Sequence, residues 1–334
     1  MSVHVSSHVV SSIVTTLRAA GCVFAEDEAD LLVSAATDHA GLAAMVERRA
    51  AGLPLEHVLG WAEFGGLRID VDPGVFVPRR RTEFLVEQAV ALAAPGAVVV
   101  DLCCGSGALG AALAAAMDGI ELHAADVEPA AVRCARRNIG DAGRVHEGDL
   151  FEPLPGTLRG RVGILLANVP YVPTDDVELL PAEARLHEPR VALDGGADGL
   201  DVLRRVAAEA PRWLAPGGHL LVETSERQVP RAEETVARAG LVPRVVTRDE
   251  LCATVVIATR PGAPAAPPAL SSVADAPSPS SQLLSSRGDP IRLPLPPWMR
   301  RSRTPLLLPL PIVDEVVRLG TLDRVWAASR RARK

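Results

Sequence analysis

Several kinds of residue are scarce in this chain, and their scarcity disfavours whole classes of site. Among 334 residues lysine and tyrosine occur once each, asparagine occurs twice, and aromatic residues make up 3%. The five cysteines form no Cys-x-x-Cys pair and have no histidine at metal-ligand spacing, so we predict reduced thiols and no metal site. No apolar run reaches the roughly 18 residues needed to span a membrane, and residues 1–17 lack the features of a signal peptide. We therefore expect a cytoplasmic protein that does not enter membranes.

The overall charge is acidic, which disfavours a protein that coats nucleic acid. The formal net charge is −6 at pH 7 and the pI is about 5.8, whereas nucleic-acid-binding domains usually present a basic face. Hydrophobic residues make up 48% and charged residues 23%, as in a globular protein with a sizeable core. Residues 168–171, Asn-Val-Pro-Tyr, stand out because they hold the only tyrosine and one of the two asparagines.

The hydrophobic pattern divides the chain into four parts. Residues 1–55 repeat apolar residues at helical spacing and predict a small N-terminal helical domain. Residues 56–82 predict a β-hairpin and linker, with a tight turn at Asp72-Pro73-Gly74. Residues 83–260 alternate strand and helix patterns. Residues 261–334 are rich in proline, serine and arginine, a composition that we expect to be mostly disordered.

Residues 83–260 predict an α/β fold. Their strand-like apolar runs lie at residues 97–102, 120–126, 145–150, 162–166, 219–223, 242–246 and 254–259. Helical stretches between the runs predict a mostly parallel sheet with helices on both faces. Polar residues stand at the ends of four successive runs: Asp101, Asp126, Asp149 and Asn168. Since ligands of open parallel sheets bind beyond the carboxyl ends of the strands, we predict one binding site there.

The first strand leads into a glycine-rich turn, Asp101-Leu102-Cys103-Cys104-Gly105-Ser106-Gly107-Ala108-Leu109-Gly110. Glycines in such a turn let a ligand approach the backbone and the start of the following helix. The Gly-x-Gly-x-x-Gly match, with Asp126 about 20 residues further on, also suits a dinucleotide-binding enzyme. The carboxylate of Asp101, which precedes the first glycine, instead favours a cationic or amino-bearing ligand over a pyrophosphate.

Further blocks, taken with this turn and with Asn-Val-Pro-Tyr, resemble one enzyme family. Residues 47–55, 60–64 and 73–83 are similar to its N-terminal part, and residues 188–200 are similar to a later part. Over about residues 30–260 the chain resembles the S-adenosylmethionine-dependent protein-(glutamine-N5) methyltransferases that modify peptide-chain release factors. The resemblance implies a Rossmann-like class I methyltransferase fold with a seven-stranded, mostly parallel sheet.

The resemblance also implies where S-adenosylmethionine would bind. Its methionine part would lie against Asp101 and the turn residues Cys103, Cys104, Gly105, Ser106 and Gly107. Asp126 would accept hydrogen bonds from the ribose hydroxyls, and Asp149 and Leu150 would flank the adenine. Asn168 would touch both cofactor and substrate, and the substrate glutamine would be held by the catalytic residues Asn168, Val169, Pro170 and Tyr171.

Four positions depart from the family's pattern. Val169 stands where the family has the first proline of Asn-Pro-Pro-Tyr, and Arg80-Arg81 replaces the Pro-Glu of Pro-Arg-Pro-Glu-Thr-Glu. Cys103 replaces the first cofactor glycine, and Leu150 replaces a residue that is commonly aromatic.

The tetrapeptide suits an amide nitrogen, which is a poor nucleophile because its lone pair is delocalised. The side-chain oxygen of Asn168 and the carbonyl oxygen of residue 169 could each accept one N–H of the substrate amide. Such positioning can supply several kcal/mol of the barrier. Because the acceptor at residue 169 belongs to the backbone, valine can serve, and Pro170 biases that residue toward an extended conformation. No metal or covalent intermediate is required.

Three other functions remain open on the sequence. The exocyclic amine of adenine or guanine is a similar nitrogen, so a nucleic-acid amino-methyltransferase is the nearest alternative. The acidic pI and the lack of a separate basic domain disfavour nucleic acid as the substrate. An NAD-dependent oxidoreductase and a non-catalytic cofactor-binding adaptor are less favoured. The resemblance implies a protein substrate, namely a peptide-chain release factor methylated on the glutamine of its Gly-Gly-Gln sequence, with a ribosomal protein as the alternative.

Overall fold

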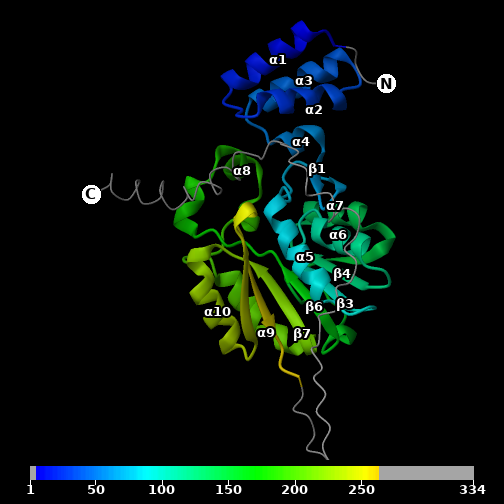
Figure 1. Cartoon of the computed structure of the whole chain (residues 1–334), viewed down its shortest axis with the longest axis vertical. Helices are drawn as coiled ribbons and strands as arrows, with labels where there is room; N and C mark the ends of the chain where they lie inside the picture. The colour runs from blue at the N-terminus through cyan, green and yellow to red at the C-terminus, as the bar shows by residue number, and fades with distance from the viewer. Residues whose placement is uncertain (1–4, 263–334) are drawn as a thin grey trace, which may run out of the picture.

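The structure, a computed structural model, describes residues 5–262 (Figure 1). Three helices begin the described part: α1 (Ser7–Ala19), α2 (Ala25–Ala35) and α3 (His39–Ala50). Their apolar faces form a small separate core that includes Leu17, Leu32 and Leu42. The tail predicted to be disordered lies outside the described residues, except for its first two positions.

A β-hairpin follows the short helix α4 (Leu55–Leu59) and connects the N-terminal helices to the rest of the chain. Its strands, β1 (Trp61–Phe64) and β2 (Leu67–Asp70), pair antiparallel and turn at Gly65-Gly66. The hairpin was predicted with its turn at Asp72-Pro73-Gly74. A tight turn does form there, where the N–H of Val75 donates to the carbonyl oxygen of Asp72 at 3.1 Å, but it follows the hairpin. Both central residues of the hairpin turn have positive φ, 58° and 73°, which two glycines adopt without strain.

The larger sheet has seven strands in the order β5-β4-β3-β6-β7-β9-β8. The strands are β3 (Val98–Leu102), β4 (Glu121–Asp126), β5 (Gly143–Glu147), β6 (Val162–Ala167), β7 (Leu214–Glu223), β8 (Val242–Arg248) and β9 (Ala253–Thr259). The first five strands of this order are parallel, and β9 runs antiparallel to both of its neighbours. The predicted seven-stranded, mostly parallel sheet is confirmed.

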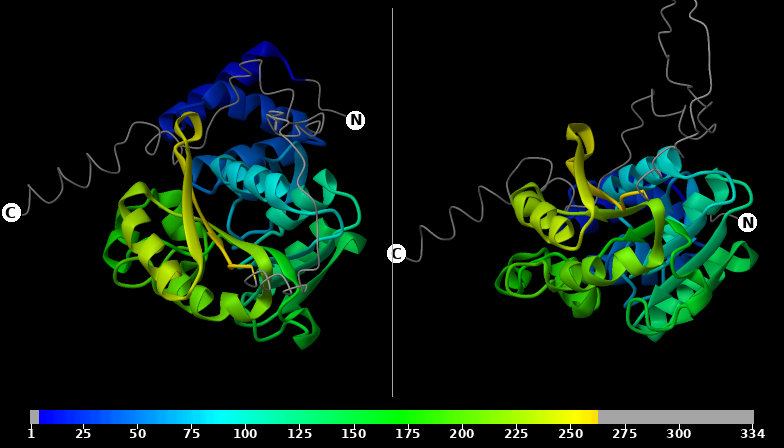
Figure 2. Two further views of the ribbon diagram at one scale, coloured as in Figure 1. Left: turned by 60° about the horizontal axis from the view of Figure 1, so that its bottom comes forward. Right: turned by 90° about the horizontal axis from the view of Figure 1, so that it is seen from below.

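Helices cover both faces of this sheet, as predicted. One face packs against α5 (Glu83–Leu92), α6 (Ala108–Ala116) and α7 (Pro129–Ile139), and the other against α9 (Asp201–Trp213) and α10 (Val229–Arg238). Alternate residues of β3 pack into the two hydrophobic cores on opposite faces of the sheet. Val99 belongs to one core and Val100 to the other. The β8–β9 hairpin, yellow in Figure 2, projects beyond the sheet. Among residues 5–262, no helix is both long and apolar enough to cross a membrane.

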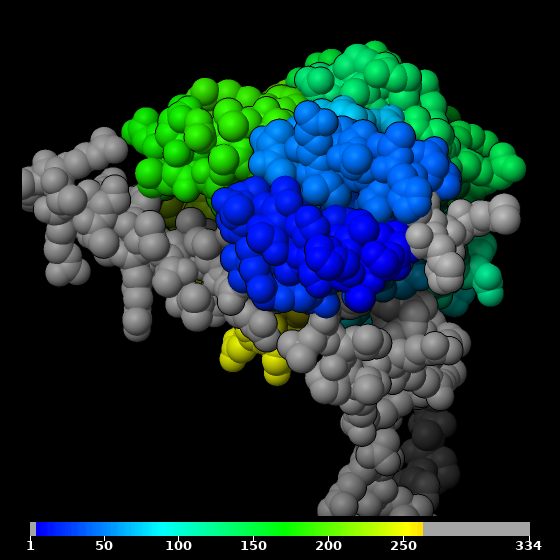
Figure 3. Space-filling model, turned by 90° about the horizontal axis from the view of Figure 1, so that it is seen from above, coloured from blue at the N-terminus to red at the C-terminus, as the bar shows by residue number. Residues whose placement is uncertain are grey.

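A buried arginine joins the N-terminal helices to the α/β part. The Arg49 side chain of α3 is 4% exposed and donates to both carboxylate oxygens of Glu28 in α2. It also donates to Glu183 at 2.7 Å, in the short helix α8 (Ala182–His187). Figure 3 shows the blue N-terminal helices lying beside the green segment that contains α8. The position of α8 is therefore tied to that of the N-terminal helices.

A second buried ion pair joins the segment after the hairpin to the segment after α8. Arg79 donates to Glu188 at 2.5 Å, and both side chains are at most 7% exposed. The guanidinium of Arg79 also lies over the ring of Phe76. Removing one member of such a pair leaves a buried charge without compensation.

We expect Glu188→Ala to lower the free energy of unfolding by about 3–5 kcal/mol, because Arg79 would stay buried without its carboxylate. Glu234→Ala is a suitable control, since its pair with Arg238 is largely exposed and worth about 0–1 kcal/mol. Urea unfolding of the two variants measures the difference. Equal losses in both would contradict the structural role given to the buried pair.

Candidate active site

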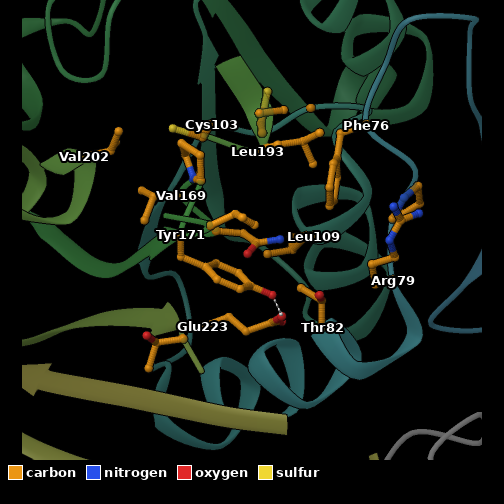
Figure 4. Close-up of a pocket in the computed structure, with 18 of the residues that line it drawn as sticks. Phe76, Arg79, Thr82, Cys103, Leu109, Val169, Tyr171, Leu193, Val202 and Glu223 are labelled. Carbon is orange, nitrogen blue, oxygen red and sulfur yellow. Dashed lines mark hydrogen bonds between the residues drawn. The ribbon is translucent and has the colours of Figure 1, made fainter. Parts of the chain in front are cut away.

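One cavity of about 520 Å³ opens at the carboxyl ends of the parallel strands (Figure 4). Its walls come from the ends of β3, β4, β6 and β7, from residues 75–82, from residues 180–193 and from the tip of the β8–β9 hairpin. Most of the residues predicted for the site line this cavity: Cys103, Cys104, Gly105, Ser106, Asp126, Asp149, Leu150, Asn168, Val169, Pro170 and Tyr171. Gly107 belongs to the same turn but does not line the cavity.

The glycine-rich turn needs a backbone that most residues avoid. Gly105 and Gly107 have φ of 55° and 78°, and a Cβ on Gly107 would come within 3.0 Å of Ala135 in α7. A Cβ on Gly105 would meet no atom within 4 Å, and Gly105 lines the cavity. A ligand can therefore approach the backbone closely at Gly105.

Cys103 adopts the same left-handed region, with φ of 54°. This conformation is strained for a residue with a side chain, which accounts for the glycine that the family has at this position. Burial raises the pKa of the Cys103 thiol, and the nearby carboxylates of Asp126 and Asp101 raise it further. The thiol thus stays protonated and unreactive near neutral pH.

Asp126, at the end of β4, presents a fixed carboxylate to the cavity. One oxygen accepts from the backbone N–H of Gly105 at 2.8 Å, and the other accepts from the N–H of Glu128 at 2.9 Å. Burial raises the pKa of Asp126, while these two hydrogen bonds oppose the rise. Each oxygen keeps a further lone pair, so the group can accept from two neighbouring hydroxyls of a ligand.

Asp101 is the predicted site residue that the structure places elsewhere. It lies within β3 and is 1% exposed, and it does not belong to the cavity wall. One carboxylate oxygen accepts from the N–H of Gly110 at 3.1 Å, in the first turns of α6, and the other has no partner among the described residues. Asp101 therefore holds the first turns of α6, which follow the glycine-rich turn. It does not reach the cavity because β3 is buried along its whole length. Burial raises its pKa from 3.8 to about 7.

Asp101→Asn should change the pH dependence of stability. Between about pH 4 and pH 7 the unfolded chain releases the Asp101 proton while the folded chain retains it, so the free energy of unfolding falls as pH rises. Asparagine keeps an acceptor for Gly110 and carries no charge. We expect the variant to match the wild type near pH 4 and to exceed it by a few kcal/mol at pH 8. Denaturant unfolding of both proteins at both pH values tests this. If the difference in the free energy of unfolding between variant and wild type is the same at pH 4 and pH 8, the prediction is refuted.

Asp149 and Leu150 follow β5, which ends earlier than predicted, at Glu147. Asp149 accepts from Arg205 of α9 at 2.5 Å, and Leu150 has a positive φ of 49°. Arg205 was not predicted, since nothing in the sequence near it indicates contact with residue 149. All three residues line the cavity, as does the apolar side chain of Val202.

The Asn-Val-Pro-Tyr segment follows β6 directly and lies in the middle of the wall (Figure 4). The half-buried carboxamide of Asn168 makes no hydrogen bond to another residue in the described part of the chain, and the carbonyl oxygen of Val169 accepts none. The Val169 side chain is 2% exposed and packs in the core shared with α9. Two acceptors next to one another in sequence are thus available to a ligand.

Tyr171 belongs to a polar cluster that the sequence did not indicate. Its hydroxyl donates to Glu223 Oε1 at 3.2 Å and accepts from the guanidinium of Arg81. Arg81 also donates from Nε to the same Glu223 oxygen at 2.8 Å. Burial raises the pKa of Tyr171, so its hydroxyl stays protonated. The sequence shows that Arg81 departs from the family's pattern and that Glu223 ends a strand-like run. The contact between the two side chains depends on the fold.

The 188–200 block lines part of the cavity and also supports the Asn-Val-Pro-Tyr segment. Val172 donates to the carbonyl of Leu193 at 3.1 Å and accepts from the N–H of Gly195 at 2.8 Å. Gln228, also not predicted, donates to the carbonyl of Tyr171 at 2.8 Å. A Cβ on Gly199 would lie 2.2 Å from the same carbonyl, so only glycine fits there. These contacts account for the glycine-rich sequence of the block.

Comparison with known proteins places this chain in a family. Residues 66–194 match the Methyltransferase small domain. The Release factor glutamine methyltransferase of Geobacter sulfurreducens is 39% identical over 208 residues, which cover 61% of this chain and 72% of the relative. The enzyme of the same description from Mycolicibacterium smegmatis is 40% identical over 67% of this chain and 79% of its own. The chain belongs to the release factor glutamine methyltransferase family. This membership confirms the resemblance stated from the sequence.

Solved structures of other methyltransferases share less sequence identity with this chain than those relatives do. A methyltransferase from Pyrococcus furiosus shares 18% identity with a TM-score of 0.45, covering 59% of this chain and 90% of that one.

Proposed function

We propose that this protein transfers a methyl group from S-adenosylmethionine to the side-chain amide nitrogen of a glutamine in a peptide-chain release factor. One observation carries the proposal: the Asn168 carboxamide and the Val169 carbonyl are adjacent acceptors on the cavity wall, without partners among the described residues. A primary amide has two N–H groups to offer them. Membership of the family supports the choice of a release factor. Release factors act on ribosomes, so we expect the activity in the cytoplasm.

The residues around the cavity fit S-adenosylmethionine. Gly105 leaves room for close approach to the backbone, and Asp126 keeps two lone pairs for the ribose hydroxyls. Asp149 and Leu150 would stand beside the adenine, with the apolar side chain of Leu150 against the base. Bound there, the cofactor supplies an electrophilic methyl group on a positively charged sulfur.

The chain's own residues prepare the acceptor nitrogen. Asn168 Oδ1 and the Val169 carbonyl oxygen would each accept one N–H, which fixes the orientation of the amide and raises electron density on its nitrogen. Pro170 restricts Val169 to extended conformations and so keeps its carbonyl in place. Tyr171, held by Arg81 and Glu223, would pack against the apolar part of the glutamine side chain.

A methylation assay with labelled S-adenosylmethionine tests the proposed function. A release factor, a ribosomal protein and RNA are offered in parallel, and the labelled site is mapped by mass spectrometry. We expect label in the release factor alone, on the glutamine of its Gly-Gly-Gln sequence. Label in RNA without label in protein would refute the proposal and favour a nucleic-acid amino-methyltransferase.

We expect Asp126→Ala to weaken S-adenosylmethionine binding by about 1–3 kcal/mol, as for loss of a charged hydrogen-bond partner. Calorimetry measures the affinity. Asp72→Ala is a control, because this exposed carboxylate pairs with Arg137 outside the cavity. Unchanged affinity in the Asp126 variant would exclude its contact with the ribose.

A further inference from the structure

Two buried polar atoms in the cavity wall have no hydrogen-bond partner among the described residues: Glu223 Oε2 and Thr82 Oγ1. Glu223 is 3% exposed and Thr82 is 1% exposed. Three other buried side-chain atoms in the described part also lack partners, but their residues, Trp61, Asp101 and Glu188, do not line the cavity. Buried polar groups in proteins are nearly always paired, so these two atoms indicate a place that a ligand completes.

The geometry of Glu223 separates its two oxygens. Oε1 already accepts from Arg81 and from the hydroxyl of Tyr171, at 2.8 and 3.2 Å. These bonds hold the carboxylate in place and leave Oε2 open. A carboxylate is only an acceptor, so the missing partner must donate a hydrogen bond.

The charge balance identifies the kind of donor. Arg81 compensates the charge of Glu223 through a hydrogen-bonded ion pair at 2.8 Å, so the site does not require a cation. A neutral N–H is sufficient. The hydroxyl of Thr82 can donate as well as accept, so it can donate a hydrogen bond to a carbonyl oxygen of the same ligand. A residue in an extended peptide presents its own N–H and its own C=O on the same side, so it can meet both groups.

The position of the two atoms favours the substrate over the cofactor. Figure 4 shows Thr82, Tyr171 and Glu223 together at one end of the cavity, with Cys103 of the glycine-rich turn at the other. Tyr171 connects Glu223 directly to the segment that carries the two amide acceptors. A peptide that inserts its glutamine toward Asn168 would bring its own backbone to the same end.

We propose that Glu223 and Thr82 form a subsite for the main-chain N–H and C=O of one residue in the peptide segment that carries the substrate glutamine, with Arg81 as a positioning residue. This inference rests on the proposed function. It also gives a role to Arg81, which stands where the family's pattern has glutamate: a carboxylate at residue 81 would lie beside that of Glu223 and repel it.

Kinetics of Glu223→Gln with intact release factor test the subsite. Glutamine keeps an oxygen for Arg81 and Tyr171 but replaces the open acceptor by an NH2 group. We expect KM for the release factor to rise 10–100-fold, with kcat within about threefold and the affinity for S-adenosylmethionine unchanged. Glu121→Gln, which removes the charge that pairs with Arg161 at the amino end of β4, should change none of these values. Thr82→Val gives a second test if the first variant folds poorly, and we expect a KM rise of about 5–20-fold.

A backbone scan of the ligand identifies the amide. Synthetic Gly-Gly-Gln peptides are made with one main-chain N–H at a time replaced by an ester oxygen. Because Tyr171 is the only tyrosine, protein with tyrosine labelled at the ε ring carbons gives NMR signals from this one residue, and these follow peptide binding. We expect one ester to weaken binding to the wild type at least tenfold and to add no further loss in Glu223→Gln.

The outcomes separate the two proposals. If the wild type methylates the release factor but Glu223→Gln and Thr82→Val leave its KM unchanged, the subsite is wrong and the proposed function stands. If the variants weaken S-adenosylmethionine binding instead, the two atoms belong to the cofactor and the inference also fails. If the wild type does not methylate the release factor, the proposed function fails and the subsite with it.

Discussion

Replacing Asn168 by alanine should lower kcat for methyl transfer by about 10²–10³, while the affinity for S-adenosylmethionine changes less than about fivefold. The alanine removes one of two acceptors that fix the amide nitrogen, and losing one preorganised hydrogen bond in an active site typically has this effect. The cofactor would keep Asp126 and the glycine-rich turn. Single-turnover kinetics with release factor and calorimetry with the cofactor measure the two quantities separately.

Val169→Pro is the matched control for Asn168→Ala. It changes the neighbouring residue to the one that the family has, and it leaves the carbonyl acceptor in place. The N–H of Val169 donates no hydrogen bond within the described residues, so proline removes none. We expect transfer to be preserved or raised. An Asn168→Ala enzyme that is as active as Val169→Pro would exclude the amide-holding role of Asn168.

A release factor with glutamate in place of the Gly-Gly-Gln glutamine should be rejected by a factor of about 10⁴. The glutamate offers no N–H to Asn168 and Val169, and it brings a negative charge against two acceptor oxygens. Sites built to pair a polar group reject analogues that lack it by about 10⁴–10⁵. Competition assays with both release factors in one reaction measure the ratio of kcat/KM.

The control for this substrate change is the affinity of each release factor for the enzyme, which depends mainly on contacts outside the glutamine pocket. Binding of the two release factors to the enzyme without cofactor should differ less than their rates, because contacts remote from the glutamine are the same. Methylation of the glutamate variant at any mapped position of the Gly-Gly-Gln sequence would contradict an amide-specific pocket.

Local sequence signals were sufficient for the sheet and for most of the cavity wall. The runs at residues 97–102 and 162–166 are continuous apolar stretches, and both became buried strands of a parallel sheet. The carboxyl ends of parallel strands lie at one edge of the sheet, so the sequence predicts that Asp126 and Asn168 lie in one site.

Predictions failed where a residue's environment comes from distant parts of the chain. Asp101 has the same local pattern as Asp126, yet one is buried behind the turn and the other lines the cavity. The hairpin turn was misplaced because Asp72-Pro73-Gly74 and Gly65-Gly66 are both good turn sequences. Pairing of Phe64 with Leu67 decided between them by burying Phe64 in the core.

The sequence by itself determined the class of fold, the strand ends that carry polar residues, and the Asn-Val-Pro-Tyr segment as a part of the chain that follows a strand and lines the cavity. These depend on periodicity and on neighbours in the chain, which a sequence displays directly. Only the tertiary structure decided that Arg81, Tyr171 and Glu223 meet, and that the oxygens of Glu223 and Thr82 are left open. Arg81 and Glu223 are 142 residues apart, and no local rule relates them. Their contact follows from packing α5 against the sheet, where burial makes hydrogen-bond pairing necessary.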